Sequence, residues 1–120
     1  MYNKKVLNYF KNPKHAGSLK NPDGVGEVIN KTCGDSMRVY IKVKGEKIEK
    51  VRIETLGCVA AIASSEALAE IAEGKKLKDA LKISKLDIVK KLGGMTPGKV
   101  HCSVLAQQGL KKAIKDFKSG

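Results

Sequence analysis

Apolar and polar residues alternate most regularly between residues 36 and 43. Every second position there is apolar, at Met37, Val39, Ile41 and Val43. A period of two is typical of a strand with one buried face. Residues 25–30 and 47–55 carry weaker forms of this pattern, and Gly45 lies in the short link before the third segment. The pattern predicts three strands, the last two paired antiparallel around a tight turn at Gly45.

The apolar residues take a helical spacing in the second half of the chain. An apolar stripe that begins at Ala60 runs to Ala72 and stops at Gly74, which predicts a helix over residues 59–73. Shorter helices are predicted over residues 77–81 and 84–92, and an amphipathic helix over residues 103–117.

The N-terminal part of the chain is less regular. Val6, Leu7 and Phe10 have helical spacing, so we expect a helix over residues 3–11 that ends before Pro13. Residues 15–26 are rich in Gly, Asn, Pro and Ser and read as a surface loop. Strands followed by helices indicate an α+β fold, a three-stranded antiparallel sheet with helices packed mainly on one face.

The length of 120 residues suits one small domain, which we expect to span residues 1–120. No apolar run approaches the roughly 20 residues that a membrane span needs. Residues 1–10 lack the apolar stretch of a signal peptide. We therefore expect a cytoplasmic protein without membrane contact.

The net charge of +12 raises the question of nucleic-acid binding. Arg38 and Arg52 are the only arginines, and aromatic residues make up 4% of the chain. Nucleic-acid recognition favours the planar guanidinium and aromatic stacking. The lysines are spread over most of the predicted elements together with Glu and Asp, which is typical of a solvated surface. We expect no nucleic-acid partner, and a docking surface for an acidic protein stays open.

The three cysteines, Cys33, Cys58 and Cys102, are odd in number and far apart. This spacing fits neither a secreted disulfide framework nor the paired hooks of zinc fingers. Each occurs where a predicted element begins or ends, and ligands from separate segments can converge at such positions. For any one of them the simpler interpretation is a small buried side chain.

Each cysteine has neighbours that change its chemistry. Asp35 adds a hard carboxylate two residues from Cys33, a mixture that suits exchangeable ligands, although Asp35 can equally cap a turn. Cys58 precedes a predicted helix whose N-terminus favours a thiolate of lowered pKa. His101 can bind metal or hold a proton for Cys102, and Lys99 can lower the pKa of that thiol or attract an anionic sulfur species.

These motifs together resemble the IscU and N-terminal NifU type of iron-sulfur cluster assembly scaffold, over nearly the whole chain. The matching segments are Tyr2 and Val6, Asn12-Pro13-Lys14, Gly17-Ser18-Leu19, Cys33-Gly34-Asp35, Thr55-Leu56-Gly57-Cys58, Ala61-Ile62-Ala63-Ser64-Ser65 and Lys99-Val100-His101-Cys102-Ser103. The resemblance implies a SufE/NifU-like fold and a scaffold rather than an enzyme.

The resemblance also implies the ligands and partners. Cys33, Cys58 and Cys102 would bind iron and sulfide as a [2Fe-2S] cluster, with Asp35 or His101 as the fourth ligand. The resemblance also implies that zinc can occupy the same site when no cluster is bound. A cysteine desulfurase would place a persulfide on Cys102, an electron donor such as ferredoxin would reduce it, and acceptor proteins would take the cluster.

Some segments depart from the family pattern. Residues 94–99 replace the Leu-Pro-Pro-Val-Lys segment that a dedicated chaperone reads, so chaperone dependence is not implied. Tyr2 resembles a residue implicated in pairing of scaffold chains, which allows a homodimer of the cluster-loaded protein. The alternative function is a zinc-dependent sulfur acceptor of the SufU type. The chain lacks the insertion of that type between Cys58 and Cys102 and carries His101, which favours the scaffold.

Overall fold

The computed structural model describes residues 2–32 and 34–119. In chain order its elements are α1 (Lys4–Lys11), β1 (Gly24–Ile29), β2 (Ser36–Lys44), β3 (Lys47–Leu56), α2 (Val59–Ala72), α3 (Leu77–Ala80), α4 (Lys85–Lys91), the 3₁₀ helix η1 (Pro97–Lys99) and α5 (His101–Ser119). The side chain of Asn3 caps α1 by accepting the N–H of Val6, and Ser84 forms a capping box with Asp87 at the start of α4.

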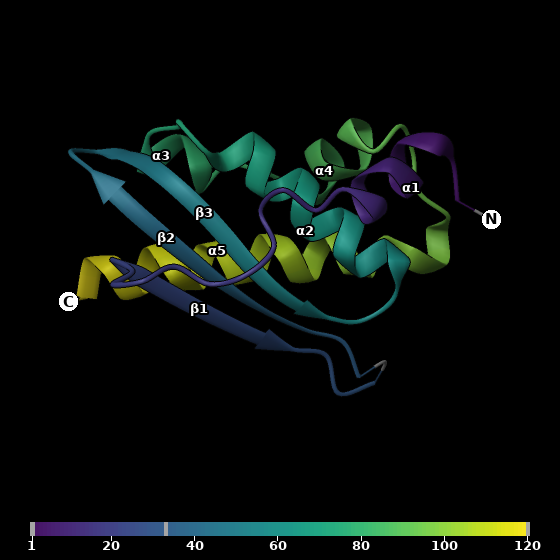
Figure 1. Cartoon of the computed structure of the whole chain (residues 1–120), viewed down its shortest axis with the longest axis horizontal. Coiled ribbons are helices and arrows are strands. Elements are labelled where there is room, and N and C mark those ends of the chain that lie inside the picture. Colours follow the sequence, from purple (N-terminus) through teal and green to yellow (C-terminus); the bar gives the residue numbers. More distant parts are fainter. Residues whose placement is uncertain (1, 33, 120) are drawn as a thin grey trace.

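The three strands form one antiparallel sheet in the order β1-β2-β3 (Figure 1). Gly45, with a φ of 65°, makes the turn between β2 and β3, as the sequence predicts. Ser36 at the start of β2 pairs with Ile29, the last residue of β1, and with Leu56, the last residue of β3. The loops that follow β1 and β3 therefore meet at one end of the sheet.

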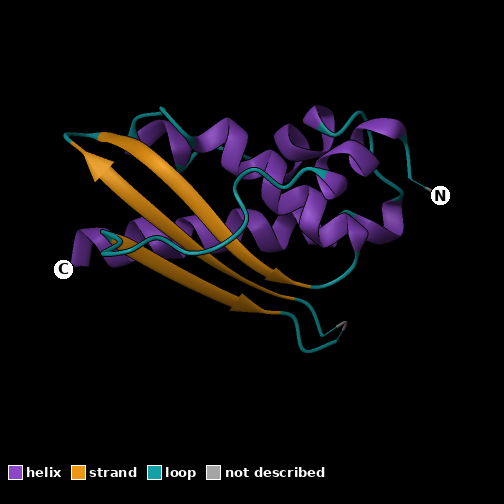
Figure 2. Ribbon diagram, viewed as in Figure 1, coloured by secondary structure: helices purple, strands orange, loops and turns teal. Residues whose placement is uncertain are grey.

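Helices cover one face of this sheet, which confirms the predicted α+β architecture (Figure 2). Helix α5 packs along β1 and β2, and α2 packs along β3. Met37, Val39 and Ile41 are buried beneath the helices, as their alternation predicts. Gly26 lets α5 approach closely, because a Cβ at this position would lie 2.3 Å from the carbonyl oxygen of Gly109.

The last helix and the expected surface loop differ most from the sequence-based expectation. The last helix starts at His101, two residues before the predicted start, because η1 leads directly into it. Part of the expected surface loop lines the free edge of β3 instead: the N–H of Ile53 donates to the carbonyl of His15 at 2.9 Å, and the N–H of Gly17 donates to the carbonyl of Ile53 at 3.0 Å. This pairing protects an edge that would otherwise be open.

The same segment is fixed by a buried carboxylate. Glu66 of α2, only 4% exposed, accepts the backbone N–H of His15 at 2.9 Å and contacts its Nδ1 at 2.6 Å. Nε2 of His15 lies 3.1 Å from Glu73. His15 thus joins the N-terminal segment to α2 and β3. Among the residues described, no helix combines the length and apolar character needed to cross a membrane.

Candidate metal centre

Three segments bring their polar side chains to one end of the sheet. Asp35 immediately precedes β2, Cys58 is the N-terminal cap of α2, and Cys102 lies in the first turn of α5. Because Ser36 pairs with Leu56, Asp35 lies beside the residues that lead from β3 to Cys58. The predicted convergence of Asp35, Cys58 and Cys102 is present in the fold.

The donor atoms of these three residues lie within 4.8 Å of one another. The sulfur atoms of Cys58 and Cys102 are 3.9 Å apart, and both thiols are free. Oδ2 of Asp35 lies 3.8 Å from the sulfur of Cys58 and 3.9 Å from that of Cys102. Two thiolates at about 2.3 Å from one tetrahedral metal ion would be about 3.8 Å apart. The thiol spacing therefore matches that of a bound metal.

Gly57 provides the space for the carboxylate. A Cβ at this position would lie 2.9 Å from Cγ and Oδ1 of Asp35 and 2.9 Å from Cβ of Ala61. Any larger residue would displace Asp35 or the first turn of α2. The sequence places Gly57 in a family motif, but its steric role becomes visible only in the folded chain.

His101 and Lys99 approach the site from the side of Cys102. Nε2 of His101 lies 3.6 Å from the sulfur of Cys102. The positive charge of Lys99 acts to lower the pKa of the Cys102 thiol. Both predicted neighbours are thus close to this thiol, whereas Asp35 contacts both Cys58 and Cys102.

Lys99 acts on the Cys102 thiol in the predicted direction, but burial outweighs it. Burial and the neighbouring Cys58 and Asp35 raise the pKa of Cys102 to about 12, and the opposing charge of Lys99 is too weak to prevent this. The side chain is 0% exposed. Desolvation disfavours the thiolate more strongly than a helix N-terminus and one lysine favour it. A bound cation would reverse this balance, since it stabilises the thiolate directly.

Buried hydroxyl groups join the helices behind the thiols. Oγ of Ser64 in α2 lies 3.3 Å from Oγ of Ser103 in α5, and both residues are fully buried. The hydroxyl of Thr55 in β3 donates to Oγ of Ser65 at 2.9 Å. The first contact connects the helices that carry Cys58 and Cys102, and the second connects β3 to α2. The sequence places all four hydroxyl residues in or beside the family motifs but does not reveal that they pair.

Cys33, the remaining predicted ligand, lies outside the described residues.

The sequence matches the family described as the NifU-like N terminal domain over residues 1–120. The chain belongs to this family. The family assignment made from the sequence motifs is thereby confirmed.

Members of the family resemble the chain over most of its length. This chain is 46% identical over 117 residues to "Iron-sulfur cluster assembly scaffold protein IscU 1" of Archaeoglobus fulgidus. The match covers 98% of this chain and 76% of that protein. The chain is 43% identical over 122 residues to "Iron-sulfur cluster assembly scaffold protein IscU" of Escherichia coli, covering 98% of this chain and 94% of the relative.

The fold is also similar to that of solved structures. One is the crystal structure of a scaffold protein for the SUF system, FiSufU, from Fervidobacterium islandicum, with a TM-score of 0.80 and 26% identity over 94% of this chain and 96% of that one. A NifU-like protein from Brucella abortus superposes with a TM-score of 0.77 at 22% identity, covering 98% of this chain and 94% of that one. This second likeness concerns the fold alone.

Proposed function

We propose that the chain is a non-enzymatic scaffold that assembles [2Fe-2S] clusters and passes them to acceptor proteins. The observation that carries this proposal is the convergence of two free thiols and a carboxylate at metal-binding distances. A carboxylate among thiolates gives a site from which metal can leave. Its hard oxygen binds iron in a sulfur-rich site less firmly than a fourth thiolate would. The cluster is cargo rather than a resident cofactor.

The cluster ligands in this proposal are Cys33, Cys58, Cys102 and a fourth group. Asp35 suits the fourth position, since its oxygen is within 3.9 Å of the sulfur atoms of both Cys58 and Cys102. His101 lies on the Cys102 side at 3.6 Å. It can replace Asp35 when the carboxylate is displaced. Iron alone or zinc would use the same donors before the cluster forms.

Sulfur would arrive as a persulfide from a cysteine desulfurase. The thiolate of Cys102 attacks the outer sulfur of the enzyme's persulfide, forms Cys102–S–SH and releases the enzyme's cysteine thiolate. Two electrons from a ferredoxin-type donor, with two protons, then cleave the S–S bond to give the Cys102 thiol and hydrogen sulfide. Because Cys102 is fully buried, the first turn of α5 must open before this transfer.

A reducing cytoplasm is the setting that suits these reactions. Free thiols at 3.9 Å would oxidise readily elsewhere. Any pairing of cluster-loaded chains would involve Tyr2, which is half-buried against the core.

Anaerobic reconstitution with iron, cysteine and a desulfurase tests the proposal. The protein should develop the visible absorption of a [2Fe-2S] cluster, with about two irons and two sulfides per cluster. Serine variants of Cys33, Cys58 and Cys102 should each lose most of it. Normal absorption in all three variants would refute the assignment of the ligands.

The alternative is a zinc-dependent sulfur acceptor, favoured by the structural similarity to FiSufU and by the tetrahedral spacing of the thiols. Metal analysis of protein purified anaerobically separates the two functions. Iron with equimolar sulfide supports the scaffold, whereas one firmly held zinc per chain and no iron uptake supports the zinc protein.

A further inference from the structure

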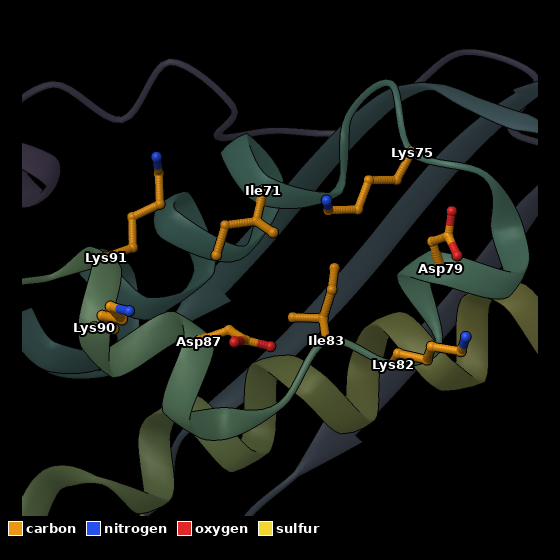
Figure 3. A pocket seen from close by; sticks show the side chains of 8 residues that line it. All are labelled: Ile71, Lys75, Asp79, Lys82, Ile83, Asp87, Lys90 and Lys91. Atoms are coloured by element: carbon orange, nitrogen blue, oxygen red, sulfur yellow. The ribbon is translucent and has the colours of Figure 1, made fainter.

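A basic hollow lies at the opposite end of α2 from the thiols. Its volume is about 450 Å³, and the end of α2, α3 and α4 surround it. Ile71 and Ile83 point toward each other across it, and the side chain of Lys75 extends over the same space (Figure 3). Ile71 follows Cys58 by thirteen residues, which corresponds to about 20 Å along the helix. We call this hollow, with the eight side chains that line it in Figure 3, the basic groove.

Two of the charges that line the groove already have partners. Nζ of Lys91 forms a 3.0 Å ion pair with Glu70, and this bond is the main reason that the pKa of Lys91 is raised. Oδ2 of Asp87 accepts the backbone N–H of Ser84 at 2.8 Å in the capping box of α4. A ligand that binds either side chain would first have to break the existing ion pair or hydrogen bond.

The remaining charges are unbalanced. Lys75, Lys82 and Lys90 are exposed, and their ammonium groups have no hydrogen bond or ion pair within residues 2–32 and 34–119. Asp79 is the one carboxylate of the groove without such a partner in the same ranges. Among the described residues, three unpaired ammonium groups against one unpaired carboxylate, around an apolar centre, favour a ligand that is both anionic and partly apolar.

We propose that the basic groove binds an acidic segment of a partner protein, in which carboxylates on either side of an apolar side chain meet the three lysines. The apolar residue would contact Ile71 and Ile83. The proposal goes beyond the scaffold function, because no residue of the groove belongs to the thiol site. A partner held there would not cover the thiol site at the far end of α2.

Phosphate-bearing ligands fit the groove less well. Its basic residues are all lysines, so no guanidinium is present to bind phosphate oxygens in pairs. At the start of α4, the N–H groups of Ser84 and Asp87 are already engaged by the capping box. No aromatic side chain lines the hollow to stack on a base. These features select carboxylates over nucleotides or nucleic acid.

Binding of a labelled peptide tests the proposal. The probe is a short end-capped peptide with two glutamates on each side of a leucine, and fluorescence anisotropy reports its affinity for the full chain. Replacing the three lysines together, as Lys75→Glu, Lys82→Glu and Lys90→Glu, should weaken binding by about tenfold, since each exposed ion pair contributes modestly. Replacing the same three lysines by glutamine should weaken binding less. Replacing the leucine of the peptide by serine should also weaken binding.

A matched variant makes the test specific. Lys20→Glu, Lys50→Glu and Lys111→Glu change the net charge by the same amount at exposed positions outside the groove. This control should bind the peptide within about twofold of the unmodified protein. Equal weakening in both triple variants would overturn the proposal, because it would indicate diffuse charge attraction. Tighter, groove-dependent binding of a single-stranded oligonucleotide would overturn it as well.

Discussion

The sulfur atoms of Cys58 and Cys102 lie 3.9 Å apart although 44 positions separate them in the chain. This distance is too long for a disulfide and close to that of two thiolates sharing a metal ion. The helices that begin at these residues are joined by the Ser64 and Ser103 hydroxyls. The fold itself therefore holds two of the proposed ligands at a spacing that suits a metal ion.

The two thiols should react differently in the metal-free protein. Cys58 is half-buried, whereas Cys102 is fully buried and has a pKa raised to about 12. At pH 8 iodoacetamide should therefore modify Cys58 well before Cys102. Mass spectrometry of digested protein measures the order. Modification of Cys102 first would mean that the start of α5 opens readily without a partner.

Replacing Asp35 by alanine should slow cluster release. If Asp35 is the hard oxygen ligand proposed above, the change removes the donor that favours ligand exchange, so the cluster should pass to an acceptor roughly tenfold more slowly. Stopped-flow measurement of transfer checks this. Asp35→Asn controls for side-chain size. Complete loss of cluster binding in Asp35→Ala would show that the carboxylate is essential for assembly instead.

Gly57→Ala should disturb the site by steric overlap. The added Cβ would lie 2.9 Å from Asp35 and from Ala61, and such overpacking costs about 1–3 kcal/mol of unfolding free energy. Urea denaturation of the metal-free protein measures this cost. Gly98→Ala is the matched control because a Cβ there meets nothing within 4 Å. Equal stability of the two variants would place Asp35 elsewhere in solution.

His15 should make stability depend on pH. Burial lowers its pKa, but the hydrogen bonds to Glu66 and Glu73 and their charges outweigh burial, so the folded pKa lies above the ordinary value of 6.5. This contribution is complete below pH 6.5 and is lost as the pH rises through the folded pKa. The stability advantage of the native protein over His15→Gln should therefore shrink between pH 6 and pH 9.

Urea unfolding at a series of pH values tests the His15 contribution. Comparing each value with that of His15→Gln removes the contribution of titratable groups that behave alike in both proteins. A difference in unfolding free energy that stays constant or grows across this range would contradict the contacts with Glu66 and Glu73.

Local patterns were enough to predict most of the fold. The alternation around Val39 and the turn at Gly45 determine the hairpin, because they act between neighbouring residues. The convergence of Asp35, Cys58 and Cys102 was also predictable, since element ends and family motifs both point to it. The distances between these three side chains were not predictable, because they depend on how α2 and α5 pack.

Other features depend on tertiary contacts that the sequence does not reveal. The raised pKa of Cys102 follows from complete burial, which no local motif encodes. The contacts of His15 with Glu66 and Glu73 connect a loop to a distant helix. The basic groove likewise forms only when α2, α3 and α4 come together.

Transfer of a preassembled cluster tests the scaffold function most directly. The reconstituted protein is mixed anaerobically with a metal-free [2Fe-2S] ferredoxin, and circular dichroism follows both proteins. If the protein is a scaffold, its cluster signal should decline as that of the ferredoxin rises in equal amount. A cluster that never forms, or that stays bound while the ferredoxin remains empty, would contradict it.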